Sequence, residues 1–362
     1  MTRINWSAKL LGILAAALLT AVAAAALPDN PYQRWQQVEN TLFANAAWSY
    51  ERIHFDPRPV DVAIIGPSRS QIGLSAPRIA ERLAALGQPV TVANMSVIES
   101  GRNLEWAITD ELFKVKHPKL LIILVGEERN RWGHPGFKYV APAAAIAWPP
   151  QPFLHNSLYD ITYLPFRQMR LFAASLFPET FGLRTRFDPA RYAALPTDFT
   201  TSQVLTDGKL IDMEVAHSAD ELRAEARAFA ATQQESMIPP ALAPVIEADD
   251  PVYVGAMARL AAAHNTRVLF VFLPEFGGAT TIEGRDFYAR FGPVENYGDL
   301  ARDPAMFQSF AHLNRRGALI ASDRVAAAAA PLLAAATRDR YAPTTGDGPV
   351  DQRSRRYPAG AD

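Results

Sequence analysis

The sequence predicts an α/β protein built around a parallel sheet, and three patterns lead to this fold class. Apolar runs recur along the chain, they do not alternate with polar residues, and amphipathic segments of helical periodicity separate them. The runs cover residues 60–65, 90–95, 119–125 and 267–273. Strands of this kind are covered by helices on both faces, so we expect a flavodoxin-like, three-layer parallel sheet.

Composition narrows the class of protein. The chain has 362 residues, of which 49% are hydrophobic, and its formal net charge is −1. The apolar share is enough for a buried core, and the balanced charge gives no basic footprint for nucleic acid. There are no cysteines, which excludes disulfides, thiolate metal sites and a cysteine nucleophile.

The N-terminus predicts export. Arg3 and Lys9 precede an uncharged apolar run at residues 10–27, which as a helix rises about 27 Å, enough to cross a bilayer core. Positive charge before such a run places the N-terminus in the cytoplasm and the rest outside. Residues 1–28 are expected to be an uncleaved anchor or a signal peptide cut near Ala26. The protein is then held in the inner membrane facing the periplasm, or secreted to the periplasm.

The next elements follow in order. Residues 29–58 predict a connector with a helix over 33–53, bracketed by prolines. The main domain spans 59–336, with helices at 75–86 and 102–116 between the first three strands.

After the third strand, prolines and aromatic residues break the periodicity, and we expect an irregular inserted lid over about 134–250. Ser218 and Glu221 form a capping-box pattern that opens a helix within the insert. Helices at 250–264 and 317–336 flank the fourth strand. The polar residues 337–362 predict a disordered tail.

A serine lies directly after the first strand. The run 60–65 ends at Gly66, Ser68 follows two residues later, and a helix begins near Ser75. This order presents a hydroxyl at the carboxyl edge of the sheet, where open α/β folds bind ligands. A serine needs a base to become a nucleophile, and the candidate base is His312, which precedes the closing helix. The alternative is that residues 66–70 are only a turn that caps a helix.

These segments together resemble the SGNH/GDSL hydrolase superfamily. The resemblance spans residues 58–135 and 264–335, and the His312-Leu-Asn-Arg-Arg-Gly-Ala318 segment is especially similar. It implies that Ser68 is the nucleophile and His312 the base. Gly101 and, more weakly, Asn130 would be the oxyanion donors.

With its predicted export and N-terminal anchor, the chain further resembles the branch of this superfamily that acts on cell-envelope polysaccharides. That branch includes the alginate O-acetyltransferase-like proteins. The resemblance therefore implies an acyl esterase or O-acyltransferase without metal or organic cofactor. Its partners would be a polysaccharide or acylated carbohydrate and a membrane-bound O-acyltransferase.

Two positions depart from the family pattern. Pro67 replaces the aspartate before the serine, which removes an N–H and fixes φ. Ser309 stands where the family has an aspartate that orients the histidine. Asp299 and Asp303 are the candidates to replace that acid. A Ser–His dyad and a catalytically inactive, glycan-binding or scaffold relative both remain open.

Other features favour weaker interpretations. His134 follows the third strand, and we interpret it as a loop histidine. Arg69, beside the serine, is expected either to contact an acidic glycan or to pair with a carboxylate. Residues 66–70 nearly match the G-x-S-x-G elbow of α/β-hydrolases, but that elbow usually follows several strands.

Overall fold

The computed structural model describes residues 6–126, 132–204, 210–232, 242 and 250–341, and it shows an α/β protein. Its central sheet has five parallel strands in the order β2-β1-β3-β6-β7. The strands are β1 (Val62–Ile65), β2 (Val92–Asn94), β3 (Leu120–Val125), β6 (Arg267–Phe272) and β7 (Val294–Asn296). This is the strand order of flavodoxin-like sheets, in which the order reverses between the first and third strands.

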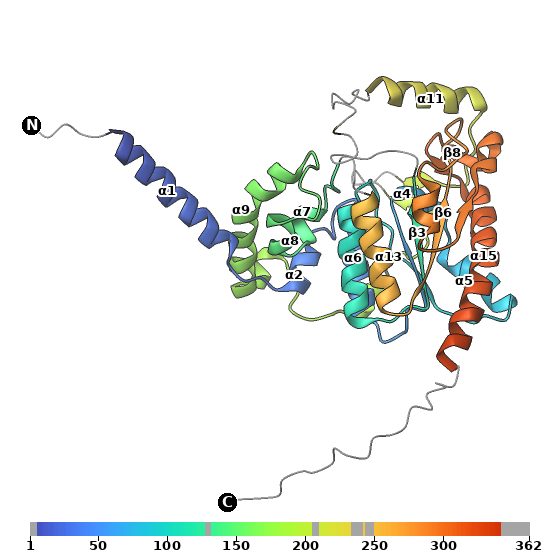
Figure 1. Ribbon diagram of the computed structural model, residues 1–362, viewed down its shortest axis with the longest axis horizontal. Coiled ribbons are helices and arrows are strands. Elements are labelled where there is room, and N and C mark those ends of the chain that lie inside the picture. Colours follow the sequence, from blue (N-terminus) through green and yellow to red (C-terminus); the bar gives the residue numbers. More distant parts are fainter. Residues whose placement is uncertain (1–5, 127–131, 205–209, 233–241, 243–249, 342–362) are drawn as a thin grey trace, which may run out of the picture.

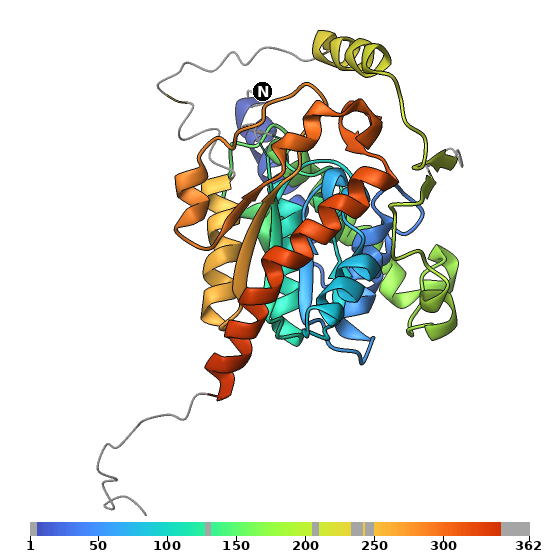
Figure 2. The same ribbon diagram turned by 90° about the vertical axis from the view of Figure 1, so that its right-hand side faces the viewer.

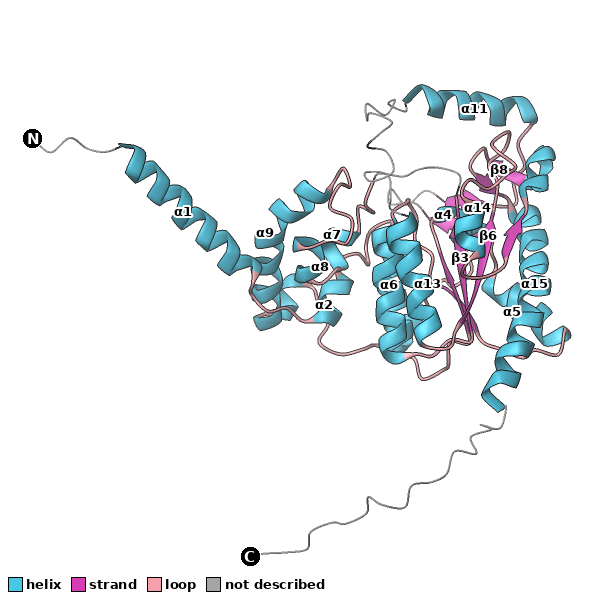
Figure 3. Ribbon diagram, viewed as in Figure 1, coloured by secondary structure: helices cyan, strands magenta, loops and turns pink. Residues whose placement is uncertain are grey.

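Helices cover both faces of the sheet (Figures 1 and 3). Side chains alternate along β1, so that Ala63 and Ile65 join the core on one face and Val62 and Ile64 the core on the other. The first face is covered by α3 (Ala44–His54), α6 (Arg102–Val115) and α13 (Gly255–Ala263). The second is covered by α5 (Ala76–Ala85) and α15 (Arg315–Tyr341). The predicted layered sheet is therefore present.

The connector is two helices and not the single one predicted over 33–53. The helix α2 (Pro31–Gln36) begins after Asn30, whose side chain accepts from the N–H groups of Tyr32 and Gln33. It ends before turns that lead into α3.

The sequence missed one strand of the central sheet, and it missed several short elements outside the sheet. The strand β7 is only three residues long, and α14 (Arg285–Ala289) precedes it. Its sequence, Val-Glu-Asn, has no apolar run, which is why periodicity did not reveal it. Shorter elements are α4 (Ser68–Gly73), the π-helical turn η2 (Asp250–Val254), the 3-10 turns η3 (Gly298–Arg302) and η4 (Pro304–Met306), and the hairpin strands β8 (Phe307–Ser309) and β9 (His312–Leu313).

The insert is more helical than expected. Between residues 134 and 201 it contains α9 (Ser157–Leu176), a helix of 20 residues that includes Pro165. The other elements of the insert are α7 (Phe137–Val140), α8 (Ala143–Ala147), η1 (Pro178–Phe181), α10 (Pro189–Ala193), β4 (Ser202–Val204), β5 (Leu210–Asp212) and α11 (Ala219–Thr232). The expectation of an irregular insert was wrong for this part, because Pro165 and the aromatic residues around it lie within a continuous helix. The predicted capping box is present: Glu221 N–H donates to Ser218 Oγ, and Glu221 Oε2 accepts from Ser218 N–H.

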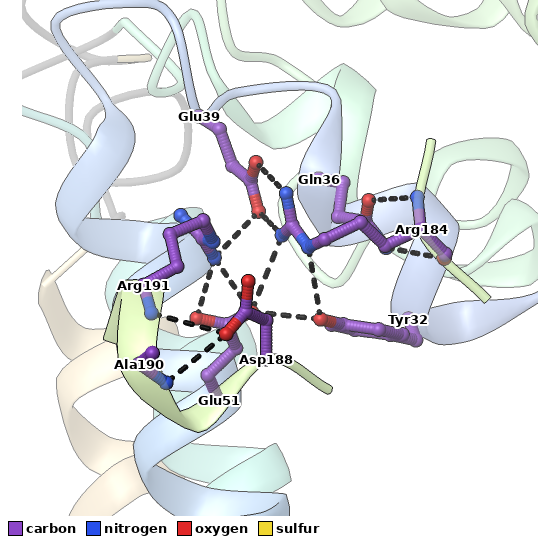
Figure 4. Close-up of polar contacts among 8 residues, drawn as sticks. All are labelled: Tyr32, Gln36, Glu39, Glu51, Arg184, Asp188, Ala190 and Arg191. Carbon is purple, nitrogen blue, oxygen red and sulfur yellow. Dashed lines mark hydrogen bonds and ion pairs between the residues drawn. The ribbon is translucent and has the colours of Figure 1, made fainter. Parts of the chain in front are cut away.

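Ion pairs fasten the insert to the connector helices (Figure 4). The Glu51 side chain, on α3, is almost fully buried, and both of its oxygens accept from Arg191 Nη2 at 2.7 Å. Arg184 pairs with Glu39 and Glu51, and Tyr32 donates to Glu51 at 2.8 Å. Because a buried carboxylate is stable only when it is paired, this network fixes residues 184–191 against the connector.

The two ends of the described chain are helical (Figures 1 and 2). At the N-terminus, α1 (Trp6–Ala25) projects from the body and is exposed over most of its length. At the other end, α15 continues to Tyr341, five residues beyond the expected end at 336, and residues 342–362 of the predicted tail lie outside the described chain.

Among the described residues, one helical segment, Arg315–Ala336, is long and apolar enough to cross a membrane, and it packs on α5 as a core helix. The apolar stretch Lys9–Ala25 of α1 is shorter.

Candidate active site

The local sequence brings Ser68 to the carboxyl end of the first strand. Gly66 follows β1, and a β-carbon there would lie 2.7 Å from Leu124 Cβ, so only glycine permits this approach to β3. Pro67 is extended and precedes α4, and its carbonyl accepts from the N–H groups of Ser70 and Gln71. Ser68 is therefore the first residue of α4, half-buried beside the point where the strand order reverses.

His312 reaches this serine from the opposite end of the sequence. It lies on β9, which pairs with β8 and packs against α4. Its Nε2 atom lies 2.9 Å from Ser68 Oγ, although the two residues are 244 positions apart. The predicted proximity of the two side chains is confirmed, and their separation is that of a hydrogen bond.

The other nitrogen of His312 contacts a hydroxyl instead of a carboxylate. Ser309 Oγ lies 2.9 Å from His312 Nδ1, from the facing position of the hairpin. When Nδ1–H donates to Ser309, Nε2 is left unprotonated and accepts from the Ser68 hydroxyl. Ser309 therefore occupies the position of the acid in a triad and can fix the ring, but it brings no charge.

The surroundings of His312 favour its neutral form. Burial, together with the positive charge of Arg69, lowers the pKa of His312 to about 4. Arg69 pairs with Glu275 at 3.6 Å, so one of the two expectations for this arginine, pairing with a carboxylate, is met. A histidine with a pKa well below 7 is unprotonated at neutral pH and can accept a proton there.

Two asparagines hold the segments that carry the pair. Asn94, buried at the end of β2, donates to the carbonyls of Ser70 and Leu74 at 2.9 Å and so fixes α4. Asn314 Oδ1 accepts from Gly317 N–H at the start of α15, and its Nδ2 donates to Ala305 O. The sequence signal for Asn314 was its place two residues after His312, but its supporting role needed the structure.

Gly101 lies at the same edge of the sheet. It lines a small cavity of about 40 Å³ together with Pro67 and Arg69, the two neighbours of Ser68. A β-carbon on Gly101 would come within 2.1 Å of His134 N, so the close packing of these two segments also requires glycine. Asn130, the weaker oxyanion candidate, lies outside the described residues.

Neither of the two aspartates expected to replace the missing acid contacts His312. Asp299 forms a bidentate pair with Arg324 at 2.7 and 2.8 Å. Asp303 caps the turn η4 by accepting from Ala305 N–H at 2.9 Å. That expectation was wrong because Ser309, on the strand next to His312, already occupies the position beside Nδ1.

His134 is buried away from any described hydroxyl partner. Its Nε2 lies 2.7 Å from Ile98 O, and its Nδ1 accepts from Gly136 N–H at 2.9 Å. Burial lowers its pKa to about 4, against the opposing effect of the Ile98 hydrogen bond. Both ring nitrogens are satisfied by the backbone, which agrees with the interpretation of a structural histidine.

A larger groove opens one helical turn beyond the serine. It has a volume of about 430 Å³ and runs between the connector and residues 195–202 of the insert. Gln71, on α4, lines it together with Trp48, Asn45, Leu42 and Phe199. A mixture of amide and aromatic side chains suits a polar ligand with an apolar face.

Comparison with known proteins finds no family model that matches the chain and no curated protein whose sequence matches it. Among the described residues, no group of three or more histidine and acidic side chains is placed to hold a metal ion.

Proposed function

We propose that this protein is an SGNH-like serine acyl esterase or O-acyltransferase that acts on an exported or cell-envelope polysaccharide. The observation that carries the proposal is the 2.9 Å separation of His312 Nε2 and Ser68 Oγ at the carboxyl edge of a parallel sheet. With a pKa of about 4, His312 is unprotonated at neutral pH, which is the form that a general base requires.

The reaction has two halves. Ser68 Oγ attacks the acyl carbonyl while its proton moves to His312 Nε2. The C–O bond to the leaving alcohol breaks, and His312 returns the proton to that oxygen. The acyl group then sits on Ser68 as an ester. Water or a sugar hydroxyl attacks this ester, and His312 again accepts the proton. The bond between the acyl carbon and Ser68 Oγ then breaks, His312 returns the proton to Ser68 Oγ, and the product is released. Water gives hydrolysis and a sugar hydroxyl gives transfer.

The oxyanion donors follow from the resemblance and the position of the residues. Backbone N–H groups aimed at the developing negative charge are a large part of acyl-transfer catalysis. Gly101 faces the cavity that Pro67 and Arg69 line, which supports the assignment of its N–H to this role. Asn130 would add a side-chain donor.

Two features outside the Ser68–His312 pair, a groove and the helix α1, suggest a substrate and a location. In this proposal the groove that Gln71 lines receives the carbohydrate part of an acyl ester or of an acceptor, and its amide and aromatic side chains support that role. The exposed, apolar helix α1 supports an inner-membrane anchor with the catalytic domain in the periplasm. A membrane-bound O-acyltransferase would be the partner that supplies the acyl group.

The decisive experiment is labelling with a fluorophosphonate, combined with acyl-ester turnover. Wild-type protein is expected to be labelled at Ser68, and Ser68→Ala should lose both labelling and turnover. Ser70→Ala is the matched control, because Ser70 lies on the same helix and its hydroxyl bonds only to Pro67 O. That variant should keep its label and lose about 1 kcal/mol of stability.

A second candidate is a non-catalytic relative that binds glycan or supports an acylation or secretion complex. It is favoured by one observation, the neutral Ser309 in place of an acid beside His312. Absence of fluorophosphonate labelling in a folded wild-type protein would select this candidate and reject the enzyme.

A further inference from the structure

The helix α9 exposes large apolar side chains on its outward side, although its inward side buries Arg167 and Gln168 beside Leu164 and Leu171. A helix on the surface of a soluble domain buries its apolar stripe and exposes its polar side. In α9 the outward side chains include Leu158, Met169 and Leu176, which are 73%, 48% and 58% exposed. Successive members of this set are 11 and 7 residues apart, so they lie on one side of the helix. Ile161 and Phe166 flank them and are exposed as well.

The inward side of α9 is held by polar groups. Arg167 has no exposed surface and donates to the carbonyls of Lys138 and Ala141 at 2.9 and 2.7 Å. Gln168, also buried, donates to Leu27 O at 2.7 Å. A rotation that buried the apolar side would break these bonds and leave buried polar groups without partners, so the outward orientation is fixed.

The apolar side of α9 adjoins a second exposed apolar element. The helix α1 projects from the body and packs against α9 only near its own end, where Ala24 is buried (Figure 1). Gln168 on α9 donates to the carbonyl of Leu27, two residues beyond the end of α1. The rest of α1 exposes large apolar side chains, among them Leu11, Leu14 and Leu18. The two helices therefore present adjoining apolar surfaces that no described part of the chain covers.

The side chains around this surface favour lipid as its partner. Lys138 Nζ lies 4.2 Å from the centre of the exposed Tyr159 ring and 5.7 Å from that of Tyr163. Trp148, which is 84% exposed, follows α8, and α8 packs on α9. Tyrosine, tryptophan and lysine gather at the level of the headgroups, and a helix with one apolar side lies in the plane of that region.

We infer that the outward side of α9 lies in the lipid interface and is a second membrane contact, beside the N-terminal helix. This inference rests on the anchor in the proposed function and extends it. One helix alone would leave the domain free to swing, whereas two contacts fix its orientation relative to the bilayer. The contact does not involve Ser68 or His312.

The absence of cysteine allows a direct test on the full chain. Single variants Met169→Cys on α9, Leu14→Cys on α1 and Ala230→Cys on α11 each receive a nitroxide label. The matched control is Ala230, exposed on a helix far from α1 (Figure 1). The labelled proteins are placed in vesicles of phosphatidylethanolamine and phosphatidylglycerol, and collisions with oxygen and with a water-soluble nickel chelate are measured.

For Met169→Cys, the ratio of oxygen to nickel collisions should exceed that of Ala230→Cys by on the order of fivefold, because an interfacial helix is immersed by several ångströms. Equal ratios would overturn the inference, and so would a label shielded from both reagents, which indicates a protein partner. Leu14→Cys reports the anchor separately. If its label lies in lipid while that of Met169→Cys lies in water, the anchor holds and the second contact fails. If both labels lie in water, the anchor fails as well. Acyl turnover tests the catalytic proposal independently of all three labels.

Discussion

Two histidines, of which His134 is buried and His312 half-buried, have the same lowered pKa and different kinds of neighbours. Burial lowers the pKa of both His134 and His312 to about 4. The ring nitrogens of His134 contact the backbone at Ile98 and Gly136. Those of His312 contact two serine hydroxyls, Ser68 and Ser309. The shared pKa therefore reports burial and does not distinguish a structural histidine from a reactive one.

The hydrogen-bond partners of the two rings distinguish His134 from His312. A backbone N–H does not give up its proton at ordinary pH and a backbone C=O has none to give, so the His134 ring only links two backbone segments. A serine hydroxyl can give up its proton and form a bond to carbon. The position of His312 beside such a hydroxyl, at the carboxyl edge of the sheet, is what makes it the candidate base.

The largest expected effect is that of His312→Ala on turnover. Loss of a general base lowers acyl turnover by about 10²- to 10⁴-fold. The melting temperature should change little, because the ring is partly exposed and its two partners are hydroxyls that water can satisfy. Steady-state turnover and thermal unfolding measured together check this. Turnover that stays within a few-fold of wild type would remove His312 from the mechanism.

The converse is expected of His134→Leu, which should cost stability and spare turnover per folded molecule. The substitution leaves Ile98 O and Gly136 N–H without partners in a buried position, at about 1–3 kcal/mol each. Because the folded pKa lies below the unfolded value near 6.5, wild-type His134 contributes stability above pH 6.5 that is lost as the pH falls toward 4. Denaturant unfolding should therefore show a smaller loss between pH 7 and 5 in the variant. A loss equal to that of wild type would contradict this account.

Replacement of Ser309 by aspartate tests how much a charge beside His312 would contribute at the candidate active site. A carboxylate beside Nδ1 stabilises the imidazolium that forms when Ser68 loses its proton, so turnover should rise by about 10- to 100-fold. Ser309→Asn is the matched control, since it offers a neutral oxygen of similar reach and should give no gain. Presteady-state acylation with an activated ester measures the step directly. Equal rates in both variants would show that charge at this position does not limit the reaction.

The smallest expected effect is that of pH on kcat/KM of the wild-type protein. The base must be unprotonated, and with a pKa of about 4 it is so throughout the range from pH 8 to 5. The profile should be level there and fall only near pH 4. In Ser309→Asp the falling limb should move to higher pH, because the carboxylate favours the protonated ring. A wild-type limb near pH 6.5 would show that the ring is not held in its neutral form by burial.

Local patterns were enough to predict the layered sheet and the candidate pair. Unbroken apolar runs predicted four of the five strands, and the serine after the first run predicted where Ser68 would lie. The short strand β7 and the helix α9 were missed for different reasons. The first is too short for any period to be visible, and the second contains Pro165 and an apolar stripe that points outward.

By itself, the sequence determined the parallel sheet, the apolar N-terminal helix and the residue types of the candidate site, because these depend on periodicity and on the order of residues around each strand. Only the tertiary structure decided which oxygen faces His312 Nδ1, where Asp299 and Asp303 lie, and which side of α9 is buried. The first outcome depends on the register of the hairpin that places Ser309 opposite His312, and the others depend largely on partners distant in the chain, such as Arg324 for Asp299 and Leu27 for Gln168 on α9. Neither a hairpin register nor a distant hydrogen-bond partner leaves a mark on local periodicity.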